Sequence, residues 1–123
     1  MRPEDRDAAH IWDAIEADEA IALYVNDRAF DDYLVDSMLR AAVERQLTVL
    51  GEAAKRMSEA FRAAHPEIEW RSIVGLRNVL MHEYDEIDQK RIFVIATDFV
   101  PRLVSSLRAL LPEIPPDPEL SEP

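Results

Sequence analysis

Four residues that can handle phosphate esters lie close together in the chain: Arg77, Asn78, His82 and Tyr84. A histidine side chain gains and loses a proton near neutral pH, and an arginine carries a permanent charge on a planar fork that matches phosphate oxygens. RNA supplies its own nucleophile, the 2′-hydroxyl, so its cleavage does not strictly require a metal. His82 would move the proton, Arg77 would stabilise the charge that builds on phosphorus, and Asn78 would orient the imidazole or the phosphate. These residue types therefore favour phosphodiester cleavage.

The spacing places these residues near the end of a helix. Because successive helical residues turn by about 100°, Asn78 and His82 share a face, whereas Arg77 lies roughly 140° away from His82 around the axis. Arg77 must therefore reach round the helix, or the helix must unwind locally. His82 and Tyr84 share a side only where the chain becomes extended. We expect a polar cluster at a helix C-terminus, opening onto a cleft.

The single histidine of this cluster predicts an assembly of two chains. Cleavage through the 2′-hydroxyl benefits from both an acid and a base, and each chain offers only His82 in the cluster. A two-fold dimer that brings both copies of His82 into one cleft supplies the pair, and two-fold dimers are the commonest oligomers. The chemistry therefore predicts a homodimer.

Each of these residues also has a purely structural interpretation. His82 can satisfy a carbonyl at the helix end, or pair with Glu83 or Asp85. Arg77 can bridge to an acidic neighbour, and Tyr84 can pack at the edge of the core. An arginine followed five positions later by a histidine is a weak signal by itself. The asparagine directly after the arginine and the tyrosine two positions after the histidine make the pattern more specific.

The other residues that could carry chemistry are expected to be structural. Two isolated histidines are interpreted as surface or boundary residues: His10 and His65. A run of carboxylates fits helix capping and solvation better than a divalent metal site: Glu83, Asp85, Glu86 and Asp88. Two aromatic residues are expected to anchor the core or a dimer interface: Trp12 and Trp70. No metal or cofactor is predicted.

Helical periodicity extends over most of the chain, with apolar residues at three- and four-residue steps. It predicts a short piece at 30–34 and longer helices over about 5–25, 39–64, 70–82 and 88–110. Pro66 should end the second long helix, and Pro101 should bend the last one. The expected fold class is all-α, an up-and-down bundle of four to five helices. It forms a single domain, residues 1–112, followed by a Pro-rich tail, residues 113–123.

The formal charge of −11 excludes a protein that coats nucleic acid through a broad basic face. The charge is uneven: residues 1–36 carry −8, residues 37–82 carry +2 and residues 83–123 carry −5, so the candidate site ends the one stretch that is not acidic. The absence of Cys excludes thiolate chemistry, and two glycines are too few for a Gly-rich phosphate loop. An acidic start and the lack of a long apolar run predict a soluble, cytoplasmic protein without a membrane segment.

The segment Ile73-Val-Gly-Leu-Arg-Asn-Val-Leu-Met-His-Glu-Tyr84, preceded by Trp70, resembles the signature of HepT-like ribonucleases of the HEPN superfamily. That signature is an arginine, four residues, a histidine, one residue and a tyrosine. The segment 47–58 is similar to the family's long second core helix. The segment 84–88, which leads to a Pro-bent last helix, is similar to the close of the family's domain. The resemblance covers roughly residues 5–112.

The resemblance implies a dimeric, metal-independent endoribonuclease that serves as the toxin of a toxin–antitoxin pair. In such a protein Arg77 and His82 would be the catalytic pair at the dimer cleft, supported by Asn78. The implied partner is an MNT-type nucleotidyltransferase antitoxin, which would neutralise the toxin by adenylylating Tyr84. Added negative charge beside the cleft would repel the phosphates of RNA.

Two alternatives stay open at this point. The first is a catalytically silent helical module that dimerises and binds a nucleotidyltransferase partner. The second, less favoured, is a nucleotide-binding helper protein. Both accept the helical fold, because a bundle hosts unrelated activities.

Overall fold

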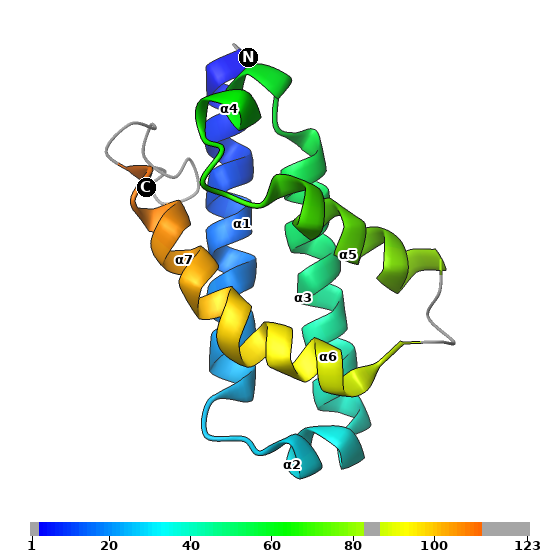
Figure 1. Ribbon diagram of the computed structural model, residues 1–123. Coiled ribbons are helices and arrows are strands. Elements are labelled where there is room, and N and C mark those ends of the chain that lie inside the picture. Colours follow the sequence, from blue (N-terminus) through cyan, green and yellow to red (C-terminus); the bar gives the residue numbers. More distant parts are fainter. Residues whose placement is uncertain (1–2, 83–86, 112–123) are drawn as a thin grey trace, which may run out of the picture.

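The computed structural model of the chain describes residues 3–82 and 87–111, and these residues are helical with no strand (Figure 1). The all-α prediction is therefore confirmed. The long helices are α1 (Pro3–Val25), α3 (Ser37–Arg56), α5 (Trp70–His82) and a continuous segment of α6 (Gln89–Val94), the π-helical turn η2 (Ile95–Phe99) and α7 (Val100–Arg108). Two short helices join them: α2 (Phe30–Val35) and α4 (Glu59–Ala64).

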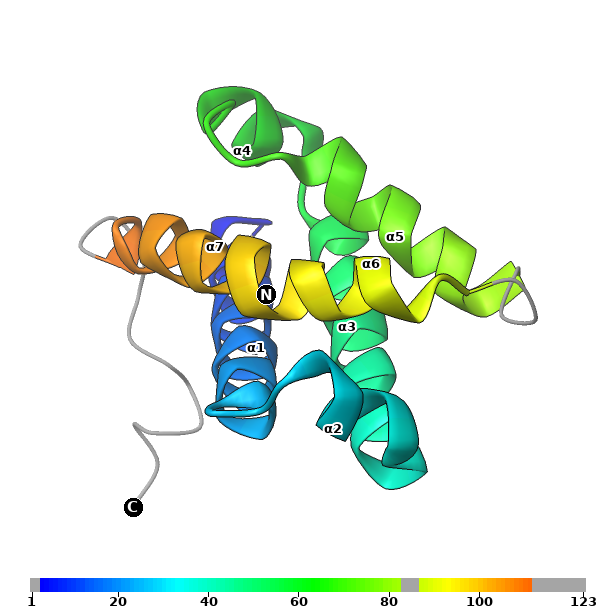
Figure 2. The same cartoon turned by 60° about the horizontal axis from the view of Figure 1, so that its bottom comes forward.

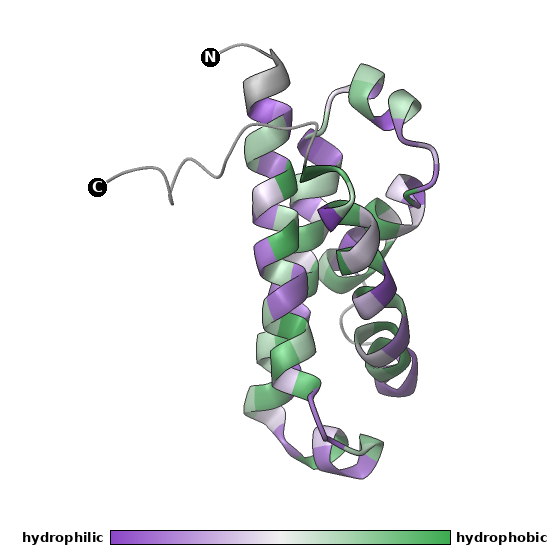
Figure 3. Ribbon diagram, turned by 90° about the vertical axis from the view of Figure 1, so that its left-hand side faces the viewer, coloured by the Kyte–Doolittle hydropathy of each residue, from purple (hydrophilic) through white to green (hydrophobic). Residues whose placement is uncertain are grey.

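The core lies between α1 and α3, which run antiparallel side by side, with α7 against α1 and α5 against α3 (Figures 1 and 2). The segment α6–η2–α7 crosses both long helices obliquely. The helices are amphipathic, with hydrophobic and hydrophilic residues alternating along them (Figure 3). The most deeply buried large aliphatic side chains come from α1, α3 and α7: Ile11, Ile15, Ile21, Val43, Leu47, Leu50, Val100 and Leu107.

One carboxyl group is sealed inside this core. Asp18 of α1 has no exposed surface, and neither of its oxygens has a hydrogen-bond partner among the described residues. The pKa of Asp18 is raised from 3.8 to about 8, mainly by burial and to a smaller extent by the nearby Glu19 carboxylate. Asp18 is therefore protonated and uncharged at neutral pH, which avoids the cost of an unpaired buried charge.

The prediction of one continuous helix over about 39–64 is wrong, because the chain forms two helices there, α3 and α4. Met57 has extended backbone angles, φ −61° and ψ 144°, and the Ser58 hydroxyl caps α4 by accepting from the Phe61 N–H at 3.1 Å. Asp7 of α1 accepts hydrogen bonds from the Ser58 backbone N–H at 2.8 Å and from its hydroxyl at 2.7 Å. A contact between residues distant in sequence thus fixes the break that the apolar stripe concealed.

The last helix continues through Pro101, and a π-helical turn ends two residues before this proline. Proline lacks an N–H and its ring clashes with the carbonyl four residues earlier, which is that of Thr97. Thr97 lies inside η2, where the wider winding changes the position of that carbonyl. The side chain of Thr97 also bonds within this turn, since its hydroxyl donates to the Phe93 carbonyl at 2.9 Å. Helical continuity through Pro101 therefore depends on a local change of winding.

Other sequence signals are confirmed at the helix ends. α1 ends at Val25, and Asp27 follows in a left-handed conformation with φ 59°. Asp88 caps α6 by accepting from the Arg91 N–H at 3.2 Å. No helix within 3–82 and 87–111 is long and apolar enough to cross a membrane. The predicted tail, residues 113–123, lies outside the described residues.

Both tryptophans pack into the fold, as expected for anchors. Trp12 packs against the core with part of its surface exposed, and Trp70 is buried at the start of α5. The Trp70 indole N–H donates to the His65 carbonyl at 3.0 Å. The His65 ring lies 4.5 Å from the ring of Phe61, so this histidine is a half-buried boundary residue. His10 on α1 is likewise half-buried.

Candidate active site

The candidate site lies on α5, whose bounds, Trp70–His82, match the sequence prediction. Arg77, Asn78 and His82 all belong to this helix. The helix stays α-helical through His82, so it does not unwind between Arg77 and His82. Arg77 and His82 therefore remain on different sides of α5, as the ideal helical angle predicts. Tyr84 lies outside the described residues.

Arg77 is held against α3 rather than extended into solvent. Only 14% of its side chain is exposed, and its guanidinium forms an ion pair with Glu52 of α3 at 3.6 Å. The same guanidinium donates to the Asn78 amide oxygen at 3.1 Å. Its Nε–H is buried with no partner among the described residues. Arg77 is thus fixed in place, with one donor still unsatisfied.

Gly51 of α3 makes this position of Arg77 possible. A Cβ atom built on Gly51 would lie 2.2 Å from the Arg77 Cβ, 2.9 Å from its Cγ and 3.2 Å from the Ile73 carbonyl oxygen. Such distances are far below van der Waals contact, so any side chain here would push α5 away from α3. The absence of a side chain at Gly51 therefore lets Arg77 pack directly against the backbone of α3.

Gly51 and Glu52 contact Arg77, and the local sequence pattern does not predict this. The available signal was a glycine inside an otherwise well-formed amphipathic helix, which usually has a packing reason. Gly51 and Glu52 lie 26 and 25 positions before Arg77, and nothing in local spacing connects them to it. Only the crossing of α3 and α5 does so.

His82 and Asn78 share the exposed side of α5. Both side chains are exposed, and no hydrogen bond or ion pair joins His82 to another described residue. Position 82 is the last of the helix, so a positively charged imidazole there would interact favourably with the helix dipole. Within one chain, the structure brings Arg77 and Asn78 together and leaves His82 apart from Arg77.

The chain that follows the motif is anchored to the rest of the fold. Buried Tyr33 of α2 donates its hydroxyl to the Gln89 amide oxygen at 3.3 Å, and the Gln89 amide nitrogen donates to Glu44 of α3 at 3.4 Å. Burial raises the pKa of Tyr33 to about 12, with Glu44 adding to the rise and Arg40 opposing it. Tyr33 is therefore a neutral donor throughout the physiological pH range, and it ties the start of α6 to α2.

An arginine fixed on one side of a helix and an exposed histidine at its end fit the chemistry of phosphodiester cleavage on an all-α fold. The family described as "Ribonuclease HepT-like" matches residues 13–110, which include all of α5. The chain belongs to the HepT-like ribonuclease family, within the HEPN superfamily, and is a ribonuclease.

Relatives of similar length support the same assignment. A protein of Methanocaldococcus jannaschii named "Putative RNase MJ0127" is 32% identical over 113 residues, which are 92% of this chain and 93% of the relative. A protein of Thermococcus cleftensis named "Probable ribonuclease HepT" is 32% identical over 101 residues, 82% of this chain and 92% of the relative. No solved structure gives a significant match to the chain.

Proposed function

We propose that this ribonuclease cuts RNA internally without a metal, with His82 as the acid–base group and Arg77 as the group that stabilises charge on phosphorus. The main support for the proposal is that α5 carries one fixed cation and one exposed imidazole. Arg77 is nearly buried and oriented by Glu52 and Asn78, whereas His82 is exposed at the helix end. A fixed cation and a free imidazole suit these two roles.

The reaction follows from the chemistry of RNA. One His82 imidazole accepts the proton of the 2′-hydroxyl, and the 2′-oxygen forms a bond to phosphorus. The bond from phosphorus to the 5′-oxygen breaks, and that oxygen takes a proton from a second, protonated His82. The Arg77 guanidinium stabilises the negative charge on the non-bridging oxygens during this exchange. Each step moves one proton and needs no metal.

A homodimer supplies the second histidine in this scheme. The surface next to His82 supports it, since Val79 is 38% exposed and Met81 is 46% exposed on the last turn of α5. Exposed apolar side chains beside a polar site are typical of protein interfaces. Sizing of the protein in solution tests the dimer, and a monomer at micromolar concentration would remove the two-histidine cleft.

The role of a toxin, neutralised by a nucleotidyltransferase antitoxin of the MNT type that adenylylates Tyr84, completes the proposal. It is supported by the position of Tyr84, two residues after His82, where added phosphate would repel RNA. Tyr84→Phe should cleave RNA as before but escape neutralisation by the antitoxin. Continued neutralisation of this variant would remove Tyr84 as the modification site.

Cleavage of RNA in the presence of a chelator tests the catalytic proposal. His82→Ala and Arg77→Ala should each lower the rate by about 10²–10⁴, the range for loss of an acid–base or charge-stabilising group. His82 is exposed, so His82→Ala should unfold at the same temperature as the unmodified protein. If the unmodified protein cuts RNA no better than His82→Ala, the chain is the catalytically silent dimerisation module instead.

A further inference from the structure

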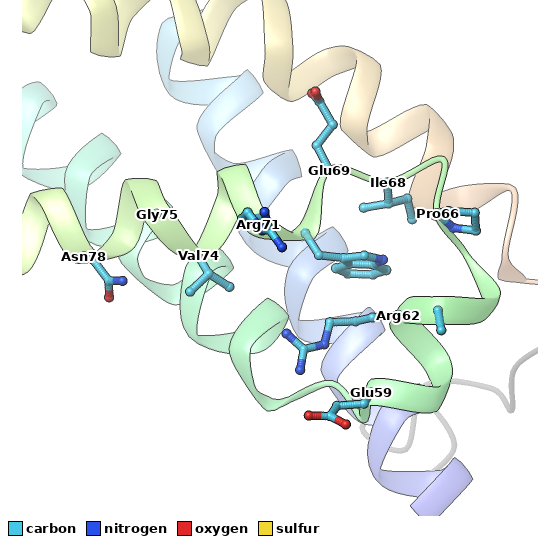
Figure 4. Close-up of a pocket in the computed structure, with 11 residues that line it drawn as sticks. Glu59, Arg62, Pro66, Ile68, Glu69, Arg71, Val74, Gly75 and Asn78 are labelled. Atoms are coloured by element: carbon cyan, nitrogen blue, oxygen red, sulfur yellow. The ribbon is translucent and has the colours of Figure 1, made fainter.

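A groove of about 690 Å³ lies between α4 and the face of α5 that carries Asn78 (Figure 4). Its lining includes Arg62 from α4, and Arg71, Val74 and Asn78 from α5. The groove therefore begins beside one residue of the candidate active site and extends from it along the helix.

Two arginines extend into this groove from opposite walls. Figure 4 shows Arg62 reaching from α4 toward α5, and Arg71 at the first turn of α5. Neither guanidinium forms an ion pair or a hydrogen bond with another described residue. Arg77 differs from both, because its ion pair with Glu52 orients its guanidinium. The hydrogen-bond donors of the two groove arginines are thus available to an anion.

The acidic residues of the lining oppose this charge only in part. Glu69 points away from α4 in Figure 4, whereas the Glu59 carboxylate lies on α4 beside the Arg62 guanidinium. Along α5, from Arg71 to Asn78, the residues that line the groove include one cation and no carboxylate. The charge of this stretch is complementary to a phosphate chain, in a protein whose formal charge is −11.

Helical geometry connects the groove to the site. Arg71, Gly75, Asn78 and His82 follow one another at steps of four, three and four residues, so they lie along one side of α5. At about 1.5 Å of rise per residue, Arg71 lies about 10 Å from Asn78 and about 16 Å from His82 along the helix axis. A strand bound at His82 can therefore continue past Asn78 to Arg71.

We propose that this groove binds the RNA strand on one side of the cleavage point, with Arg62 and Arg71 contacting its phosphates. The inference rests on the proposed function and extends it. The groove gives the enzyme a preference for single-stranded RNA long enough to reach from His82 to Arg71. Contacts of this kind set affinity and register and carry no base specificity.

Binding of a short fluorescent single-stranded RNA at several salt concentrations tests the groove, with His82→Ala as the parent so that no RNA is cut. Arg62→Ala/Arg71→Ala should lower the slope of log affinity against log salt by about 1.4, because each phosphate contact on a single strand contributes about 0.7. The matched control is Arg28→Ala/Arg102→Ala, which removes the same charge from exposed ion pairs outside the groove. The control should leave more of the slope intact.

Cleavage by the chain with His82 present provides a second readout. Arg62→Ala/Arg71→Ala should raise KM for the longer RNA without changing kcat, and should cut a dinucleotide as the unmodified chain does. The proposal is overturned if the salt slopes of the groove and control variants agree, or if both RNA lengths are affected equally. It is also overturned if the groove variant binds RNA normally but loses a partner protein. Failure of the proposed function differs, because it leaves the unmodified chain unable to cut either RNA.

Discussion

The helices α1 and α5 both carry ionisable groups, but the environments of these groups are opposite. α1 packs against α3 and α7, and its Asp18 is sealed, unpartnered and uncharged at neutral pH. α5 packs chiefly against α3, so one side of it holds Arg77 in an ion pair while another leaves His82 in solvent. α5 thus fixes one charge against α3 and exposes a second group, whereas Asp18 lies on the side of α1 that is turned into the core.

α3 connects these two regions, since it packs against α1 and against α5. Its apolar stripe faces the core, and Gly51 and Glu52 face α5 at Arg77. On α3, the residues that build the core thus differ from those that contact Arg77. Substitutions at Asp18 of α1 should change stability alone, whereas those at Gly51 and Glu52 should also change cleavage.

The largest effect is expected from Gly51→Ala. The new methyl group would overlap the Arg77 Cβ, so α5 must shift, and overpacking of this kind costs about 1–3 kcal/mol of unfolding free energy. A shift of about 1 Å in Arg77 should lower the rate of RNA cleavage by about 100-fold. Denaturant unfolding and single-turnover cleavage measure the two effects.

Gly75→Ala is the matched control for stability. A Cβ atom on Gly75 of α5 would meet nothing within 4 Å, so the alanine should raise the unfolding free energy by about 0.5–1 kcal/mol. If Gly51→Ala is as stable and as active as the unmodified chain, the close approach of α3 to α5 does not position Arg77.

The sealed carboxyl of Asp18 predicts a pH dependence of stability. Since the pKa of Asp18 is raised from 3.8 to about 8, the folded chain holds one more proton than the unfolded chain between these values. The stabilisation is complete below the lower value, and it falls on the order of 1 kcal/mol per pH unit until pH passes about 8.

Asp18→Asn should flatten this decline, because an amide does not titrate. Urea unfolding at pH 5 and at pH 8 measures how steeply the unfolding free energy changes with pH. A constant cost of burying the amide does not affect this slope. Glu19→Gln serves as a control, since Glu19 is the smaller of the two causes of the raised pKa. Equal pH slopes for Asp18→Asn and the unmodified chain would contradict the buried proton.

The smallest effect is expected from Glu52→Gln. The amide keeps an acceptor beside Arg77 but removes the charge, and partly exposed ion pairs contribute up to about 1 kcal/mol. We expect kcat for RNA to fall by about threefold to fivefold, with KM unchanged, because the guanidinium is less well oriented. A faster enzyme would instead show that Glu52 competes with phosphate. Glu19→Gln, which breaks the exposed pair with Arg108, is the matched control.

Local sequence signals predicted much of the fold and proposed the residues of the candidate site. Periodicity predicted α5 with its bounds, and a side-chain cap predicted the start of α6 at Asp88. The same rules failed between α3 and α4, where the apolar stripe continues through Phe61 although the helix stops. The Ser58 cap was present in the sequence, but its bonds to Asp7 come from a helix that begins some fifty residues earlier.

The sequence by itself determined which residues are available for chemistry and which share a face of α5, because helical geometry is local. Tertiary structure decided which face is covered. It placed Arg77 on Gly51 and beside Glu52, left His82 in solvent and sealed Asp18 in the core. The physical reason is that these outcomes depend on how helices cross, and a crossing is fixed by contacts between residues that no local pattern connects.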